Sequence, residues 1–222
     1  MHRYQFICMN HLIFSFAFFT IFLSGCAKST DIVEPNVPPR NNETPLFQFA
    51  YKQDGTGDVK PGFSLVSATP DYPTEYGVEF TVSRKGILYA VGFRMPQAGK
   101  YFVSLWDAVT KNLILRDSVD YTDPSKFFYK DFSAQNKEVS VAESKKYMAS
   151  VHVPRSSTGA PQPYYTLFQP GVSNWVPFTR GNITITANYF KKEDFPAFPD
   201  TQIFHRDVLN GLVDIGYYAT EK

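Results

Sequence analysis

Hydrophobic and polar side chains alternate along much of this chain. Tyr76, Val78, Phe80 and Val82 occupy one set of alternate positions, and polar residues occupy the other. The alternation recurs in four further segments, residues 87–95, 101–106, 147–153 and 183–189. A period of two residues places successive side chains on opposite faces of a strand, so each segment predicts a half-buried β-strand.

Turn-forming residues separate these segments at short intervals. Short strands at such a spacing, without a convincing apolar stripe of helical period, are typical of an all-β sandwich or barrel. We therefore predict an all-β domain over residues 46–222, an antiparallel β-sandwich of the jelly-roll or immunoglobulin-like type. An apolar run at Leu46–Tyr51 opens the series of strand signals, and residues 154–180 are its longest irregular stretch.

The first residues of the chain have a different pattern. His2 and Arg3 give a basic start, an apolar run follows, and Leu23-Ser24-Gly25-Cys26 comes directly after it. This order is typical of a secretory signal peptide. An uncleaved membrane helix over residues 6–23 is the alternative, although that run lies at the short end of the roughly 17–25 residues that a spanning helix needs.

The Leu23-Ser24-Gly25-Cys26 segment also resembles the bacterial lipobox, in which a small residue precedes a cysteine that becomes the lipidated N-terminus. The resemblance implies a signal peptide over residues 1–25 and fatty acyl chains, such as palmitate, on Cys26. Two or more acyl chains give stable membrane anchoring. Residues 26–45 are rich in proline and lack apolar periodicity, which indicates an extended tether.

The expected location is therefore the bacterial cell envelope. Ala27 follows the cysteine, so the acidic inner-membrane retention signal of some lipoproteins is missing. We expect an outer-membrane lipoprotein. It can lie on the periplasmic face of that membrane or on the cell surface, and the sequence does not distinguish the two.

Charge and cysteine content narrow the function classes. The 22 Lys and Arg residues balance 21 Asp and Glu residues, whereas nucleic-acid-binding domains carry a basic patch, so we expect no nucleic-acid partner. Cys8 lies in the signal peptide and Cys26 is the lipidation site, which leaves the folded domain without a thiol nucleophile, a disulfide or a thiolate metal site. His152 and His205 are the only histidines beyond the signal peptide, which excludes a His-rich metal cluster.

Several short motifs follow one another between residues 75 and 219. They are Glu75-Tyr76-Gly77-Val78-Glu79-Phe80, Gly92-Phe93-Arg94, Ser104-Leu105-Trp106, Tyr147-Met148-Ala149-Ser150 and Leu212-Val213-Asp214-Ile215. Their order resembles the DUF4082 family of bacterial extracellular domains. The resemblance implies a β-sandwich in an extracytoplasmic setting, often beside carbohydrate-active modules, and it supplies no catalytic residues. The chain departs from the family pattern at Val151-His152 and lacks the tryptophan usual in the last strand.

Aromatic residues of the long stretch 154–180 are the first candidate ligand contacts. Tyr164, Tyr165 and Trp175 lie in it, and long loops on a rigid scaffold tend to carry function. We expect these three side chains to line an exposed cleft if the domain binds a ligand. The alternative is that they cover an edge or an end of the sandwich.

Two strand residues are further candidates. Trp106 alternates out of step with Val103 and Leu105, which places it on the other sheet face, where it can stack on a sugar ring. His152 lies beside Ser150 at a polar position of its strand. The structural alternatives are a core position for Trp106 and a surface position for His152, next to a sheet edge.

Asp54-Gly55-Thr56-Gly57-Asp58 offers two carboxylates and flexible backbone carbonyls, which makes it a candidate calcium loop. Calcium prefers oxygen ligands in such loops, but the complete Asp-x-Asp-x-Asp-Gly pattern and its distal Glu are missing. A plain turn is the favoured interpretation of Asp54 and Asp58, and we expect no cofactor.

Three functions follow from these features. The first is a non-catalytic binding lipoprotein, held on a membrane through Cys26, whose ligand is a glycan or a surface protein. The second is a structural or assembly lipoprotein with no small ligand. The third is an enzyme acting on polysaccharide, which the shortage of bases and nucleophiles disfavours.

Overall fold

The computed structural model describes residues 41–220, which lie in one compact unit. The predicted signal peptide over residues 1–25, the predicted lipidation site Cys26 and most of the predicted tether lie outside the described residues. Within them, no helix is long and apolar enough to cross a membrane.

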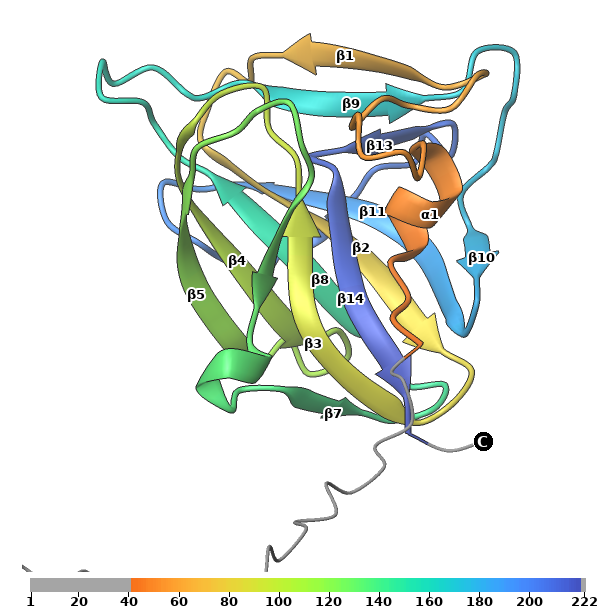
Figure 1. Ribbon diagram of the computed structural model, residues 1–222. Helices are drawn as coiled ribbons and strands as arrows, with labels where there is room; N and C mark the ends of the chain where they lie inside the picture. The colour runs from red at the N-terminus through yellow and green to blue at the C-terminus, as the bar shows by residue number, and fades with distance from the viewer. Residues whose placement is uncertain (1–40, 221–222) are drawn as a thin grey trace, which may run out of the picture. The chain divides into compact units, whose positions relative to one another are not determined.

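Two antiparallel sheets face each other (Figure 1). The larger has the order β10-β11-β2-β8-β4-β5, with β12 paired to β11. Its strands are β2 (Thr74–Val82), β4 (Gly99–Asp107), β5 (Leu113–Tyr121), β8 (Tyr147–Val153), β10 (Phe178–Arg180), β11 (Ile183–Lys192) and β12 (Thr201–Gln202). The smaller has the order β14-β3-β6, with β7 paired to β3, and consists of β3 (Gly86–Phe93), β6 (Phe128–Asp131), β7 (Val139–Val141) and β14 (Val213–Ala219). The predicted antiparallel β-sandwich is confirmed.

A third, smaller sheet runs across one end of the sandwich, at the top of Figure 1. It has the order β1-β9-β13 and consists of β1 (Ser64–Ala68), β9 (Tyr164–Phe168) and β13 (Val208–Asn210). The remaining elements are the helix α1 (Pro45–Ala50) and a 3₁₀ turn, η1 (Ser133–Gln135). This end sheet matters for function because it forms one wall of the cavity described below.

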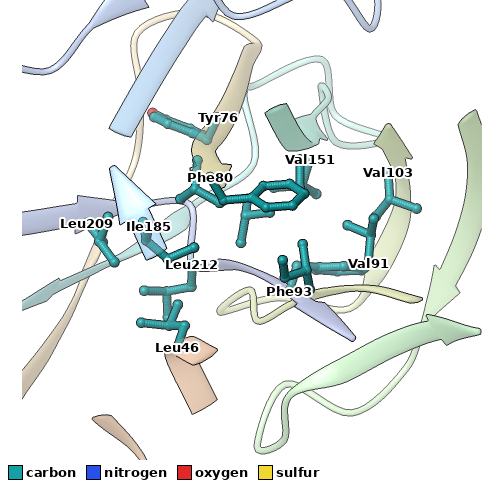
Figure 2. Packing of buried hydrophobic residues seen from close by; sticks show 14 of the residues in the cluster. Leu46, Tyr76, Phe80, Val91, Phe93, Val103, Val151, Ile185, Leu209 and Leu212 are labelled. Carbon is teal, nitrogen blue, oxygen red and sulfur yellow. The ribbon is translucent and has the colours of Figure 1, made fainter. Parts of the chain in front are cut away.

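The alternation of the sequence matches the two faces of the larger sheet. Phe80, Val103 and Val151 point into the sandwich, where they meet Val91 and Phe93 of the smaller sheet (Figure 2). These side chains are fully buried. Burial of apolar area contributes roughly 25 cal/mol per Å², so this layer is the main source of stability in a domain without cysteine.

The apolar run at Leu46–Tyr51 is a helix, and its interpretation as a strand was wrong. Pro45 begins α1, where a missing N–H costs nothing and the fixed φ suits the first turn. Leu46 and Ala50 are four residues apart, so they share one helix face, and both are fully buried. A run of six residues is too short for periodicity to separate strand from helix.

The stretch 154–180 is not one irregular loop, because it contains β9 and β10. β9 pairs with β1, about 100 residues earlier in the chain, with Ser64 opposite Phe168. Neighbouring residues do not reveal such a long-range partner. Because prolines flank β9 on both sides, the sequence pattern predicts a loop where the structure has a strand.

The predicted tether also ends earlier than residue 45. Glu43 is buried and accepts hydrogen bonds at 2.6 Å from both the backbone N–H and the side-chain amide of Asn182. Its backbone N–H donates to the carbonyl oxygen of Tyr217 at 2.7 Å. Residues 43–45 therefore belong to the folded domain.

Candidate functional site

A cavity of about 440 Å³ lies at the end of the larger sheet, where β2 begins and β11 ends. The end sheet and the segment before β13 form its other walls. Its lining residues are Pro70, Asp71, Thr74, Tyr76, Tyr164, Phe190, Lys192, Gln202, Ile203, Phe204, His205 and Asn210. Ligand sites in proteins are concave, mostly apolar and equipped with a few polar groups, and this lining has that composition.

Aromatic rings supply much of the apolar lining. The rings of Tyr76 and Tyr164 pack together with centroids 4.5 Å apart and an interplanar angle of 30°. Burial and the neighbouring Tyr164 hold the pKa of Tyr76 far above its usual value, so its hydroxyl stays protonated. Phe204 is 83% exposed at the rim, which is unusual for a phenylalanine and leaves its ring free to stack.

Polar groups stand beside these rings. Asp71 and Lys192 form an exposed ion pair at 2.8 Å on the rim, and the hydrogen bond from Lys192 lowers the pKa of the Asp71 carboxyl. Gln202, His205 and Asn210 add an amide, an imidazole and a second amide to the lining. Flat apolar rings next to hydrogen-bonding groups match a ligand with apolar faces and a hydroxyl edge, which is the chemistry of a sugar ring.

The structure separates the two tyrosines predicted as ligand contacts. Tyr164 lines the cavity. Tyr165 follows it in β9, so its side chain points to the opposite face of the strand. There the guanidinium of Arg94 lies 5.5 Å from the centre of its ring.

Trp175 lies in the hydrophobic core and not in an exposed cleft. It is 7% exposed, and its ring packs against Phe49 at 5.6 Å and Phe178 at 5.7 Å between centroids. Its indole N–H donates to the carbonyl oxygen of Asp207 at 2.6 Å. The expectation that Tyr164, Tyr165 and Trp175 line one exposed cleft is therefore wrong.

Trp106 and His152 lie on the outer face of the larger sheet, as their alternation predicts, but both are buried. Residues 193–200 cross this face. Phe198 meets the Trp106 ring edge-on at 5.7 Å, and a Cβ on Gly77 would lie 2.7 Å from Cγ of Pro199. The predicted surface position of His152 is wrong, because its side chain is buried. Trp106 is also buried, as its structural alternative expected, so it offers no sugar-stacking platform.

Trp106 and His152 belong to a buried polar cluster on the outer face of the larger sheet. The indole N–H of Trp106 donates to Oγ of Ser150 at 2.9 Å, and the Ser150 hydroxyl donates to Oε1 of Glu75. Nδ1 of His152 lies 3.4 Å from Oε2 of Glu75, and the guanidinium of Arg116 lies 5.1 Å from the Trp106 ring centre. Burial raises the pKa of Glu75 above its ordinary value.

Serine, glutamate and histidine are the residue types of a nucleophilic triad, but their order here does not suit that chemistry. A triad needs the imidazole between the hydroxyl and the carboxylate, so that it accepts the hydroxyl proton. In this cluster the carboxylate of Glu75 lies between Ser150 and His152. The cluster therefore does not support acyl transfer, and its hydrogen bonds tie β2, β8 and β4 together.

Replacing Ser150 by alanine should lower the free energy of unfolding by about 1–3 kcal/mol, because the buried Trp106 N–H loses its acceptor and Glu75 loses a donor. Urea unfolding measures the change. Ser140→Ala, at an exposed position of β7, is the matched control and should stay within about 0.5 kcal/mol of the unchanged protein. Equal stability of the two variants would contradict this account of the cluster.

The two candidate calcium ligands have separate partners. Asp54 accepts hydrogen bonds from the backbone N–H of Thr56 at 3.0 Å and from its hydroxyl at 2.6 Å. Asp58 pairs with Lys52 at 3.1 Å. Across residues 41–220, no group of three or more His, Cys, Asp or Glu side chains is placed to hold a metal ion.

Sequence reasoning missed most of the cavity. Phe204, His205 and Gln202 lie in a segment with no strand alternation, and only the fold brings them to Tyr76 and Tyr164. The one signal in the sequence was the pair Phe204-His205, an aromatic residue directly before an imidazole. Comparison of the chain with protein-family models and with curated proteins finds no match.

Proposed function

We propose that this chain is a non-catalytic, membrane-anchored lipoprotein of the bacterial cell envelope that binds a glycan. Lipid on Cys26 holds it at the membrane, and the β-sandwich presents the cavity at the end of its larger sheet. The DUF4082-like motifs favour the same extracytoplasmic setting.

The cavity between Tyr76, Tyr164 and Phe204 is the observation that carries this proposal. Its rings offer flat apolar surfaces, and Asp71, Lys192 and the neighbouring amides offer donors and acceptors at the rim. A glycan needs both, because each sugar ring has apolar C–H faces and a polar edge. Glycoside hydrolysis canonically needs two carboxyl groups, and Asp71 is the one carboxylate among the described lining residues, so binding accounts for the lining better than hydrolysis does.

Replacing Phe204 by alanine should weaken glycan binding about tenfold or more, since stacking of an aromatic ring contributes about 1–3 kcal/mol when it is desolvated on binding. Isothermal titration of the purified chain against a panel of soluble polysaccharides measures the affinity. We expect Tyr164→Ala to weaken binding as well, with a loss of stability because Tyr164 also packs on Tyr76.

Phe195→Ala is the matched control, because Phe195 is a phenylalanine of similar exposure, 79%, that lines none of the described cavities. It should leave affinity unchanged. Failure of every polysaccharide to bind the unchanged protein would refute the proposal and leave a surface protein as the remaining kind of partner.

A further inference from the structure

A second cavity of about 480 Å³ lies at the same end of the larger sheet. It is formed by the turn between β3 and β4, the residues that follow β8 and the residues before β9. Its lining residues are Gln97, Ala98, Gly99, Lys100, Phe102, Pro154, Arg155, Ser156, Ser157 and Gln162. Nothing in the proposed function uses this cavity.

The charges that line the second cavity are all positive. Lys100 and Arg155 carry them, and no acidic residue is part of the lining. Asp194 pairs with Nε of Arg155 at 3.1 Å and neutralises that guanidinium. Lys100 has no ion pair among residues 41–220, although Asp120 is its cross-strand neighbour. The cavity lining therefore includes a lysine that forms no salt bridge with the described residues.

Hydrogen-bonding groups surround that charge. Ser156 and Ser157 line the wall, and the Ser156 hydroxyl shares a hydrogen bond of 2.8 Å with the Thr158 hydroxyl. Arg155 has five N–H donors, of which Nε donates to Asp194 and Nη1 to the carbonyl oxygen of Gly159. The floor is the carboxamide of buried Gln162, which packs 2.9 Å from where a Cβ on Gly99 would lie. Oε1 of Gln162 is buried and has no hydrogen-bond partner among the described residues.

The two cavities are neighbours along the sheet end. Lys192 of β11 lies opposite Thr74 of β2, at the first cavity, and Thr74 lies opposite Val153 of β8, at the second. Pro154 follows Val153 and lines the second cavity together with Phe102 of β4. Adjacent strands are about 4.8 Å apart, so the cavities are separated by only a few strand widths.

A polar bridge stands between the cavities. Arg155 stacks over the ring of Tyr72 at 5.0 Å, and the Tyr72 hydroxyl donates to Asp194. Tyr72 follows Asp71 of the first cavity, and Arg155 belongs to the second. One extended ligand can therefore touch both cavities across this half-exposed tyrosine.

We propose that the second cavity binds the anionic group, a carboxylate or a sulfate ester, of an acidic polysaccharide whose neighbouring sugar occupies the first cavity. The ammonium of Lys100 pairs with the anion, and Arg155 and the two serines donate hydrogen bonds to it. Charge-assisted hydrogen bonds are about twice as strong as neutral ones, so this contact selects acidic over neutral glycans. This inference rests on the proposed function and names its ligand class.

The test is isothermal titration of the purified full-length chain with three probes: polygalacturonate for carboxylates, dextran sulfate for sulfate esters and dextran as a neutral glycan. We expect at least one acidic probe to bind more tightly than dextran. Lys100→Gln should weaken acidic binding about tenfold and leave dextran binding unchanged. Salt should weaken the acidic complex as well, because it screens charge pairs.

Lys137→Gln is the matched control, since it removes the same charge from an exposed lysine that lines neither cavity. If dextran binds as tightly as the acidic probes, or if Lys100→Gln behaves like Lys137→Gln, the second cavity is not an anion site and the inference is refuted while glycan binding stands. If no probe and no other polysaccharide binds, both proposals fail. Comparison of the affinities for the carboxylate and sulfate-ester polysaccharides shows which anion the site prefers.

Discussion

Replacing Asp214 by alanine should lower the free energy of unfolding by about 3–5 kcal/mol, because this carboxylate organises a buried junction. Asp214 lies in β14 and is fully buried. It accepts hydrogen bonds from the backbone N–H groups of Leu46 at 3.0 Å and Phe47 at 2.9 Å, and from the Tyr129 hydroxyl at 2.7 Å. The first two are N–H groups in the first turn of α1, which have no partner within the helix.

No local residue performs this role, since Thr44 precedes the helix without a side-chain capping hydrogen bond. Alanine at position 214 would leave all three donors buried without an acceptor. Urea unfolding measures the loss, and Asp200→Ala, an exposed aspartate near β12, is the control, expected within about 0.5 kcal/mol. If Asp214→Ala lowers the free energy of unfolding no more than Asp200→Ala does, the proposed role of Asp214 in stabilising the buried junction is wrong.

The same carboxylate makes stability depend on pH. Burial raises the pKa of Asp214 from 3.8 to about 6, despite the opposing effect of its hydrogen bonds. Between those values the folded chain holds a proton that the unfolded chain has released, so the contribution of this group to stability is complete below pH 4 and falls as pH rises to 6. The shift corresponds to a decrease of about 3 kcal/mol. Asp214→Asn should remove this part of the pH dependence, and an unchanged profile would show that another group causes it.

Trp175→Ala should also cost about 3–5 kcal/mol, the range for removing a large aromatic side chain from a core. The indole fills the space between Phe49, Phe63 and Phe178, and its N–H is satisfied by Asp207. Truncation opens a cavity among α1, β10 and the loop before β1. Urea unfolding gives the stability change, and titration at low temperature gives the glycan affinity of the folded fraction.

Phe195→Ala again serves as control, because its exposed ring supports no core packing and its loss should change stability by less than about 0.5 kcal/mol. We expect glycan affinity to survive in Trp175→Ala as long as the domain is folded. If Trp175→Ala instead leaves stability unchanged and abolishes glycan binding, then Trp175 is a ligand contact, as its place in the sequence predicts.

Some features of the fold follow from the sequence without the structure. Alternation identifies β2, β4, β8 and β11 of the larger sheet and assigns Tyr76 and Phe80 to its inner face and Trp106 and His152 to its outer face, because the period of a strand is a local property. The same pattern predicts the sandwich, since strands with one apolar face must bury it against another layer.

Burial on the outer face does not follow from the sequence. Trp106 and His152 lie on the predicted face, but whether that face meets water depends on residues 193–200, which cover it from more than 40 residues away in the chain. Polar residues such as Glu75 and Ser150 make the face look solvated in the sequence. In the structure both are buried, and the Ser150 hydroxyl donates a hydrogen bond to Oε1 of Glu75, whereas Oε2 of Glu75 has no hydrogen-bond partner among the described residues.

Sequence alone predicts most of the strand pattern and both faces of the larger sheet. It also shows that the domain lacks cysteine, and it predicts a lipid anchor at Cys26. Which aromatic residues are available to a ligand follows from the tertiary structure. Trp175 is buried because α1 brings Phe49 against it, and Tyr164 is available because β9 pairs with β1 and β13 beside the end of β2. The physical reason is that exposure depends on long-range pairing and packing, whereas side-chain alternation is set by neighbours one and two residues away.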